Sequence, residues 1–175
     1  MFSSLTYQKP AYIGFHHQAD EINTKIIQQY IQIKDSSEVR RTHHFFGRFE
    51  NTYISKTDIP EISKILNMGL FYASSILDVP QEQLKYGFWF NEMQPGDQTT
   101  LHSHEEDDEL LSAVYYIKAQ KESGDLIIQQ NAIDHHHEPE SGKMILFNPD
   151  IPHKVTINNS DSLRLSVAMN FGPKT

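Results

Sequence analysis

Residues 102–109 of the sequence, HSHEEDDE, place two histidines one residue apart ahead of five acidic side chains. Imidazole and carboxylate groups are both common ligands of transition metals. Because side chains two residues apart on a strand share a face, His102 and His104 could form half of a metal site. The alternative is a pair of surface histidines beside a solvated acidic turn, since five like charges cannot all be buried together.

Two further motifs lie toward the C-terminus. In GKMILFNPDIPHKV, a predicted strand ends in a proline-rich turn and His153 opens the next strand, at the rim of the predicted sheet. In RLS, Arg164 and Ser166 share a face of the last predicted strand, where a guanidinium and a hydroxyl could grip a carboxylate together. Each motif alone has a plainer interpretation: His153 as a structural histidine, and Arg164 as a solvent-facing or acid-paired side chain.

The first half of the chain predicts two helices that could support such a site. The first begins with Asp20 as its N-cap and repeats apolar residues at helical spacing as far as Ile33. The second has Asp58 as its N-cap, Glu61 completing a capping box, and Pro80 marking its end. Strands are predicted at residues 11–16 and 43–55.

After residue 85, short runs rich in β-branched and aromatic residues alternate with turns built from Gly, Pro, Asn and Asp. This pattern predicts an antiparallel sandwich or jelly roll, with the two helices on an outer face. We expect a single domain over residues 1–175, in which 1–85 form a flank of helices and strands and 86–175 form a mainly β core. Trp89 is assigned to the core, Asn91 to the interior of the barrel, and His135–His137 to a polar surface loop.

Composition narrows the classes of protein. The chain has 175 residues and no cysteine, which excludes disulfides, zinc–thiolate sites and iron–sulfur clusters. Its net charge is −8, and no Lys/Arg cluster stands out beyond Arg40 and Arg41, which argues against nucleic-acid binding. No apolar run is long enough for a membrane span, and the N-terminus lacks a secretory pattern. We therefore expect a cytoplasmic protein that binds neither nucleic acid nor membrane, and a dimer stays open.

The motifs together resemble the 2-oxoglutarate/iron(II)-dependent oxygenases, and in particular their small bacterial branch. The resemblance covers roughly residues 86–172 and rests on the order and spacing of Gly96, His102, His153, Arg164 and Ser166. It implies a double-stranded β-helix, a jelly roll, that binds Fe(II) and 2-oxoglutarate. The metal ligands that it implies are His102, His104 and His153, and the implied cosubstrate-binding residues are Arg164, Ser166, Tyr116 and Asn91.

One departure concerns the metal. The usual iron site of this family has two histidines and one carboxylate, whereas His104 stands here at the acid position. The small bacterial branch tends to show the same His-x-His. Either three histidines hold the iron, or an acid from Glu105–Glu109 replaces His104.

The resemblance implies a non-haem iron(II), 2-oxoglutarate-dependent dioxygenase that hydroxylates an unidentified small molecule or peptide, with desaturation and ring closure left open. No catalytic side chain is expected beyond the metal ligands. The alternative is a cupin, because GDQTTLHSHEEDDE also fits the first cupin motif with Glu109 as a fourth ligand. A cupin would give Arg164 and Ser166 no special task, and Tyr116 stands where its glycine is expected. A catalytically inactive jelly roll that binds a ligand or a protein is a third class.

Overall fold

The computed structural model describes residues 1–103 and 108–174. Along the chain the elements are β1 (Thr6–Gln8), β2 (Ala11–Phe15), α1 (Ala19–Ile33), β3 (Arg40–Phe45), β4 (Arg48–Tyr53), α2 (Ile62–Leu77), a 3-10 turn η1 (Gln81–Gln83), β5 (Leu84–Met93), β6 (Leu111–Lys118), β7 (Leu126–Gln130), β8 (Ile133–His137), β9 (Lys143–Phe147), β10 (His153–Val155) and β11 (Arg164–Pro173).

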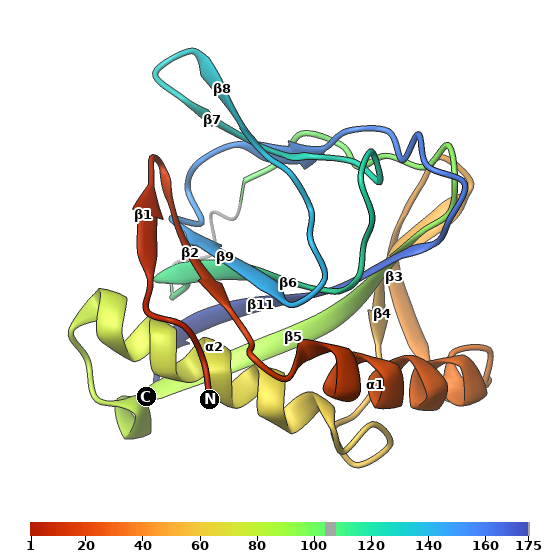
Figure 1. The fold of residues 1–175 in the computed structure, drawn as a ribbon, viewed down its shortest axis with the longest axis horizontal. Coiled ribbons are helices and arrows are strands. Elements are labelled where there is room, and N and C mark those ends of the chain that lie inside the picture. The colour runs from red at the N-terminus through yellow and green to blue at the C-terminus, as the bar shows by residue number, and fades with distance from the viewer. Residues whose placement is uncertain (104–107, 175) are drawn as a thin grey trace.

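The strands form two antiparallel sheets. The large sheet has the order β1-β2-β9-β6-β11-β5-β4-β3, and the small sheet has the order β10-β7-β8. In Figure 1 the small sheet lies on one side of the large sheet and both helices lie on the other. The prediction of a mainly β jelly roll with two outer helices is therefore confirmed. The first half of the chain also supplies β1–β4 to the large sheet, so it is part of the sheet as well as its cover.

The helices are held by the outer face of the large sheet. Alternate residues of β11 face this side, and Val167, Met169 and Phe171 are completely buried there. They share one apolar core with Ile26 of α1 and Leu66 of α2, both of which are also fully buried. The other set of β11 side chains is thereby left to face the small sheet. In the described part of the chain, no helix has the length and apolar character needed to cross a membrane.

The predicted helix caps are wrong, although the helices themselves are confirmed. Helix α1 begins at Ala19 after Gln18, so Asp20 lies inside its first turn, where its charge favours the helix dipole. Helix α2 begins at Ile62 after Glu61, and neither helix has a capping hydrogen bond from a side chain. Asp58 instead accepts a hydrogen bond of 2.7 Å from the hydroxyl of Ser55. This local turn uses the carboxylate before the helix begins.

The histidine-rich segment is a strand and not the predicted surface loop. Strand β8 pairs with β7, and Gln130 lies opposite Ile133 across a two-residue turn. Asn131 and Ala132 in this turn both have positive φ, 55° and 61°, which is the backbone twist that a tight hairpin needs. An alanine in that conformation gives no sequence signal, so the hairpin was not predictable from turn residues.

His137 at the end of β8 is only 6% exposed, and among the described residues its Nε2 has no hydrogen-bond partner. Burial lowers the pKa of His137 from 6.5 to about 4, helped by the charges of Lys143, His135 and His136 and opposed by Asp125. The unfolded chain therefore takes up a proton at a pH where the folded chain does not. His137 therefore does not lower the free energy of unfolding above pH 6.5, but it lowers this free energy progressively as the pH falls from 6.5 toward 4.

We predict that His137→Gln will flatten the loss of unfolding free energy between pH 6.5 and about 4, because it removes the group that the folded state cannot protonate. Urea unfolding at a series of pH values measures this slope. The exposed Ile133 on the same strand gives the control, because Ile133→Gln introduces the same side chain without removing a titratable group and should keep the wild-type slope. An equal slope in all three proteins would contradict the assignment.

Candidate active site

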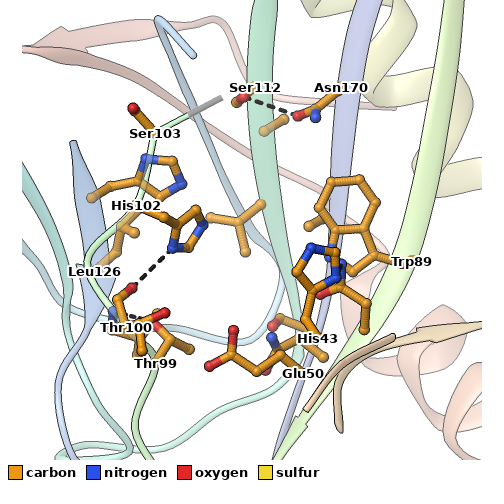
Figure 2. Close-up of a pocket in the computed structure, with 18 of the residues that line it drawn as sticks. His43, Glu50, Trp89, Thr99, Thr100, His102, Ser103, Ser112, Leu126 and Asn170 are labelled. Carbon is orange, nitrogen blue, oxygen red and sulfur yellow. Dashed lines mark hydrogen bonds between the residues drawn. The ribbon is translucent and has the colours of Figure 1, made fainter. Parts of the chain in front are cut away.

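A cavity of about 470 Å³ lies between the two sheets. Its floor is the inner face of β5, β6 and β11, where the strand register places Asn91 opposite Ser166 and Trp89 opposite Ala168. The β3–β4 hairpin and residues 99–103 form walls around it (Figure 2). This volume is in the range of ordinary small-molecule sites, so the cavity can hold a ligand of that size.

His102 and His153 are brought together by backbone pairing. The amide of each donates to the carbonyl of the other, at 3.0 and 2.8 Å, and their ring centroids are 4.4 Å apart. Nδ1 of His102 lies 2.9 Å from the carbonyl of Thr100, and Nδ1 of His153 lies 2.9 Å from the carbonyl of Ile151. Because a carbonyl only accepts, both Nδ1 atoms carry the proton, which leaves the lone pair that a metal requires on Nε2.

The third predicted ligand, His104, lies outside the described residues, as do Glu105, Glu106 and Asp107. Within the ranges 1–103 and 108–174, no group of three His, Asp or Glu side chains is placed to hold a metal. Over its described residues 99–103, the predicted strand is reduced to an isolated bridge between His102 and His153. The structure thus brings two of the three predicted histidines together, and the role of His104 stays a prediction.

The two described acids of the HSHEEDDE stretch differ. Asp108 lies at the surface and pairs with Lys85. Glu109 lines the cavity, and its Oε1 accepts a hydrogen bond of 2.6 Å from the amide of Asn170, whose own oxygen accepts from Ser112 at 2.9 Å. Glu109 is therefore held at the wall of the site by a fixed polar chain.

Arg164 is the largest fully buried side chain, at 1% exposure, and it lines the cavity. Its Nη1 donates to the carbonyl of Gly124 at 2.9 Å, and its guanidinium lies 5.0 Å from the centre of the Tyr116 ring. Nε has no hydrogen-bond partner among the residues that the structure describes. Burial lowers the pKa of Arg164, and the nearby Tyr116 and Asp125 offset only part of this. The solvent-facing alternative for Arg164 is thus wrong.

Residues 87–170 match the family model described as "Putative 2OG-Fe(II) oxygenase". The jelly-roll region belongs to the 2-oxoglutarate/iron(II)-dependent oxygenases. Residues 87–170 are accordingly those of an oxygenase that uses Fe(II) and 2-oxoglutarate, and the cupin alternative is set aside. A comparison with curated proteins gives no match.

Solved structures of low sequence identity share the fold of this oxygenase. A Pseudomonas putida prolyl-4-hydroxylase superposes with a TM-score of 0.72 at 18% identity, covering 94% of this chain and 92% of that one. EvdO2 from Micromonospora carbonacea var. aurantiaca, solved with 2-oxoglutarate, gives 0.70 at 15% identity, with coverage of 99% and 94%. The epimerase SnoN from nogalamycin biosynthesis gives 0.68 at 10% identity, with coverage of 87% and 73%.

The buried polar atoms of this oxygenase fit a dicarboxylate cosubstrate. Ser166 pairs with Asn91 on one side and with Tyr116 on the other, so both lie beside Arg164 at one end of the floor. Among the described residues, Asn91 Oδ1 and Arg164 Nε have no hydrogen-bond partner. Buried polar groups are normally paired, so this cluster can accept a polar ligand. Tyr116 itself lies below Arg164, completely buried, and does not line the cavity.

Other lining residues of the oxygenase were missed from the sequence. Trp89 was assigned to the core, but it lines the cavity, and strand alternation from Asn91 could have shown this. His43 and Glu50 reach the cavity from the β3–β4 hairpin, which only the strand order of the sheet reveals. Glu50 is 6% exposed; burial raises the pKa of its carboxyl, and Arg48 and His102 oppose this shift.

We predict that Gly124→Ala will lower the unfolding free energy by about 1–3 kcal/mol and weaken 2-oxoglutarate binding. Gly124 has a φ of +99°, and an added Cβ would lie 2.5 Å from the carbonyl of Thr156 and 3.2 Å from Arg164 Nη1. Gly87→Ala is the control, since its Cβ would meet nothing within 4 Å. Urea unfolding and cosubstrate titration measure both effects, and equal behaviour of the two variants would show that Arg164 does not depend on this turn.

Proposed function

We propose that this oxygenase hydroxylates a small molecule or a peptide side chain. In this proposal His102, His104 and His153 hold Fe(II). Arg164 and Ser166 bind the far carboxylate of 2-oxoglutarate, and Asn91 contacts the same cosubstrate. The predicted contact of Tyr116 is replaced by an indirect one, because its buried ring packs against the guanidinium of Arg164. The observation that carries the proposal is the buried Arg164, whose Nε has no partner among the described residues, on the same cavity as the His102–His153 pair.

The residues have separable tasks in this proposal. Bound Fe(II) and 2-oxoglutarate supply the oxidising chemistry: dioxygen is consumed, 2-oxoglutarate becomes succinate and carbon dioxide, and one oxygen atom enters a C–H bond of the substrate. The carbonyls of Thr100 and Ile151 fix the orientation of the two imidazoles through their Nδ1 protons. Arg164 fixes the cosubstrate by a charged contact from which water is excluded. Substrate would then occupy the remaining volume toward the β3–β4 hairpin.

We predict that Arg164→Ala will weaken 2-oxoglutarate binding by about 2–4 kcal/mol, or roughly 30- to 1000-fold, because a buried charged contact is lost. Metal content should be unchanged, since Arg164 is not a metal ligand. Calorimetric titration and metal analysis measure the two quantities. Arg40→Ala, at an exposed arginine, should leave both unchanged. Full 2-oxoglutarate affinity in Arg164→Ala, or none in the wild type, would contradict the proposal and favour a cupin-type site.

We predict that alanine at His102, His104 or His153 will abolish stoichiometric iron binding and 2-oxoglutarate turnover together. His43→Ala is the matched control, because His43 lines the same cavity but should keep the metal. Alanine at Asp108 or Glu109 should also keep the metal, with at most a roughly 10- to 100-fold loss of affinity if the carboxylate supports a ligand. Iron retained in His104→Ala but lost in a variant of Glu105–Glu109 would establish two histidines and one carboxylate instead.

A further inference from the structure

Outside the end of the cavity assigned to 2-oxoglutarate, carboxylates outnumber Lys and Arg among the described lining residues. Among its lining residues that the structure describes, the formally charged side chains other than histidine are Glu50, Glu109 and Arg164. Arg164 lies at the end assigned to 2-oxoglutarate under the proposed function. Glu109 is held by Asn170. Among the described residues, the part of the cavity left for substrate is therefore lined by a carboxylate and by His43 but by no Lys or Arg, which disfavours an anionic ligand.

Glu50 is the acid that faces this substrate space most directly. It lies on β4, and Figure 2 shows its carboxylate directed across the cavity toward Thr99 and Thr100. Its side chain is 7% exposed, and its Oε1 is buried with no hydrogen-bond partner among the described residues. An ionised carboxylate in such a place is costly unless a donor or a cation reaches it.

Arg48 fills this role only in part. Its Nη2 lies 3.8 Å from Glu50 Oε1, which makes an ion pair but not a hydrogen bond. The guanidinium donates instead to the carbonyls of Glu92 and Gln98, at 3.0 and 3.1 Å, and its Nε lies 3.5 Å from Asp97. Arg48 is thus anchored behind the wall, and it leaves Glu50 Oε1 to accept from a ligand in the cavity.

Aromatic rings surround the same space. Phe45, Tyr53 and Trp89 all line the cavity, and the ring centroids of Tyr53 and Trp89 are 6.3 Å apart. One face of Tyr53 already holds a cation, since the guanidinium of Arg40 lies 4.0 Å from the ring centre. Aromatic faces attract cations and also accept the alkyl chain that carries an ammonium group. A site that combines the Glu50 carboxylate with aromatic rings should bind an alkylammonium group more tightly than a ligand that carries a carboxylate or an uncharged alkyl chain.

We propose that Glu50 is a specificity-determining residue that binds a primary ammonium group of the substrate, so that this oxygenase acts on an amine-bearing molecule or a lysine-like side chain. The inference rests on the proposed function, because it assigns the Arg164 end of the cavity to 2-oxoglutarate. Glu50 holds the ammonium group, and the aromatic rings flank the alkyl chain. The carbon to be oxidised is thereby directed toward His102 and His153.

The chain provides its own reporter for a test. Trp89 is the single tryptophan of the sequence and lines the cavity, so its fluorescence responds to a ligand bound there. The protein is loaded with Fe(II) and 2-oxoglutarate without oxygen, and titrated with N-acetyl-lysine methylamide. The norleucine and glutamate equivalents replace the ammonium group by a methyl group or a carboxylate. Pentylamine, tested alongside, distinguishes a free amine from a peptide side chain as the source of the cation.

The lysine probe should bind the wild type more tightly than the other two capped residues, and Glu50→Gln should weaken its binding roughly 10- to 100-fold. Asp97→Asn is the matched control: it removes a carboxylate from the same Arg48 cluster without touching the cavity, and should change lysine binding less than about threefold. Thermal unfolding of both variants checks that they are folded.

Equal or tighter binding of the norleucine or glutamate probe would overturn the inference. Lysine affinity unchanged in Glu50→Gln, or no Trp89 response to either amine, would do the same. Iron and 2-oxoglutarate titrations of the same proteins separate the two levels of the account. If the wild type binds neither, the proposed function fails. If it binds both normally without a Glu50-dependent preference for the amine, only this inference fails.

Discussion

The buried guanidinium of Arg164 is the constraint on which the rest of the site depends. Its side chain is only 1% exposed, so its charge needs partners within the protein. The carbonyl of Gly124 and the ring of Tyr116 are two such partners, and the pairing of β11 with β5 holds Arg164 in place beside them. The described part of the chain still leaves Nε unpaired. Burying a guanidinium without an anion is costly, so we infer that a carboxylate of a bound ligand pairs with Arg164.

The same strand sets the division of the molecule into a supporting side and a working side. Along β11, Val167, Met169 and Phe171 face the helices, while Ser166 and Asn170 face the cavity. A shift of one residue in register would exchange the two faces and bury the polar set against the helices. The long pairing of β11 with β5 and β6 therefore protects both the core and the site geometry.

The sequence predicts this half of the molecule well because its signals are local. Alternation in β11 and the turn before His153 predict strands and a shared face, and the structure confirms them. The opposite wall was not predictable in this way. Glu50 reaches the cavity only because β4 pairs with β5, where Thr52 lies opposite Phe90 across 37 intervening residues. His43 adopts a φ of 58°, which histidine tolerates better than most residues but which its sequence context does not predict. The predicted cap of α2 was wrong because the side chain of Asp58 accepts a hydrogen bond from Ser55 in a local turn instead of capping the helix.

A crystal structure of the protein with Mn(II) and 2-oxoglutarate tests the central claim most directly, with anomalous scattering to locate the metal. The account predicts one metal on Nε2 of His102 and His153 with His104 as the third ligand, and the far carboxylate of 2-oxoglutarate on Arg164 and Ser166. A metal bound without 2-oxoglutarate, or a cosubstrate whose far carboxylate lies away from an unchanged, unpaired Arg164, would contradict it.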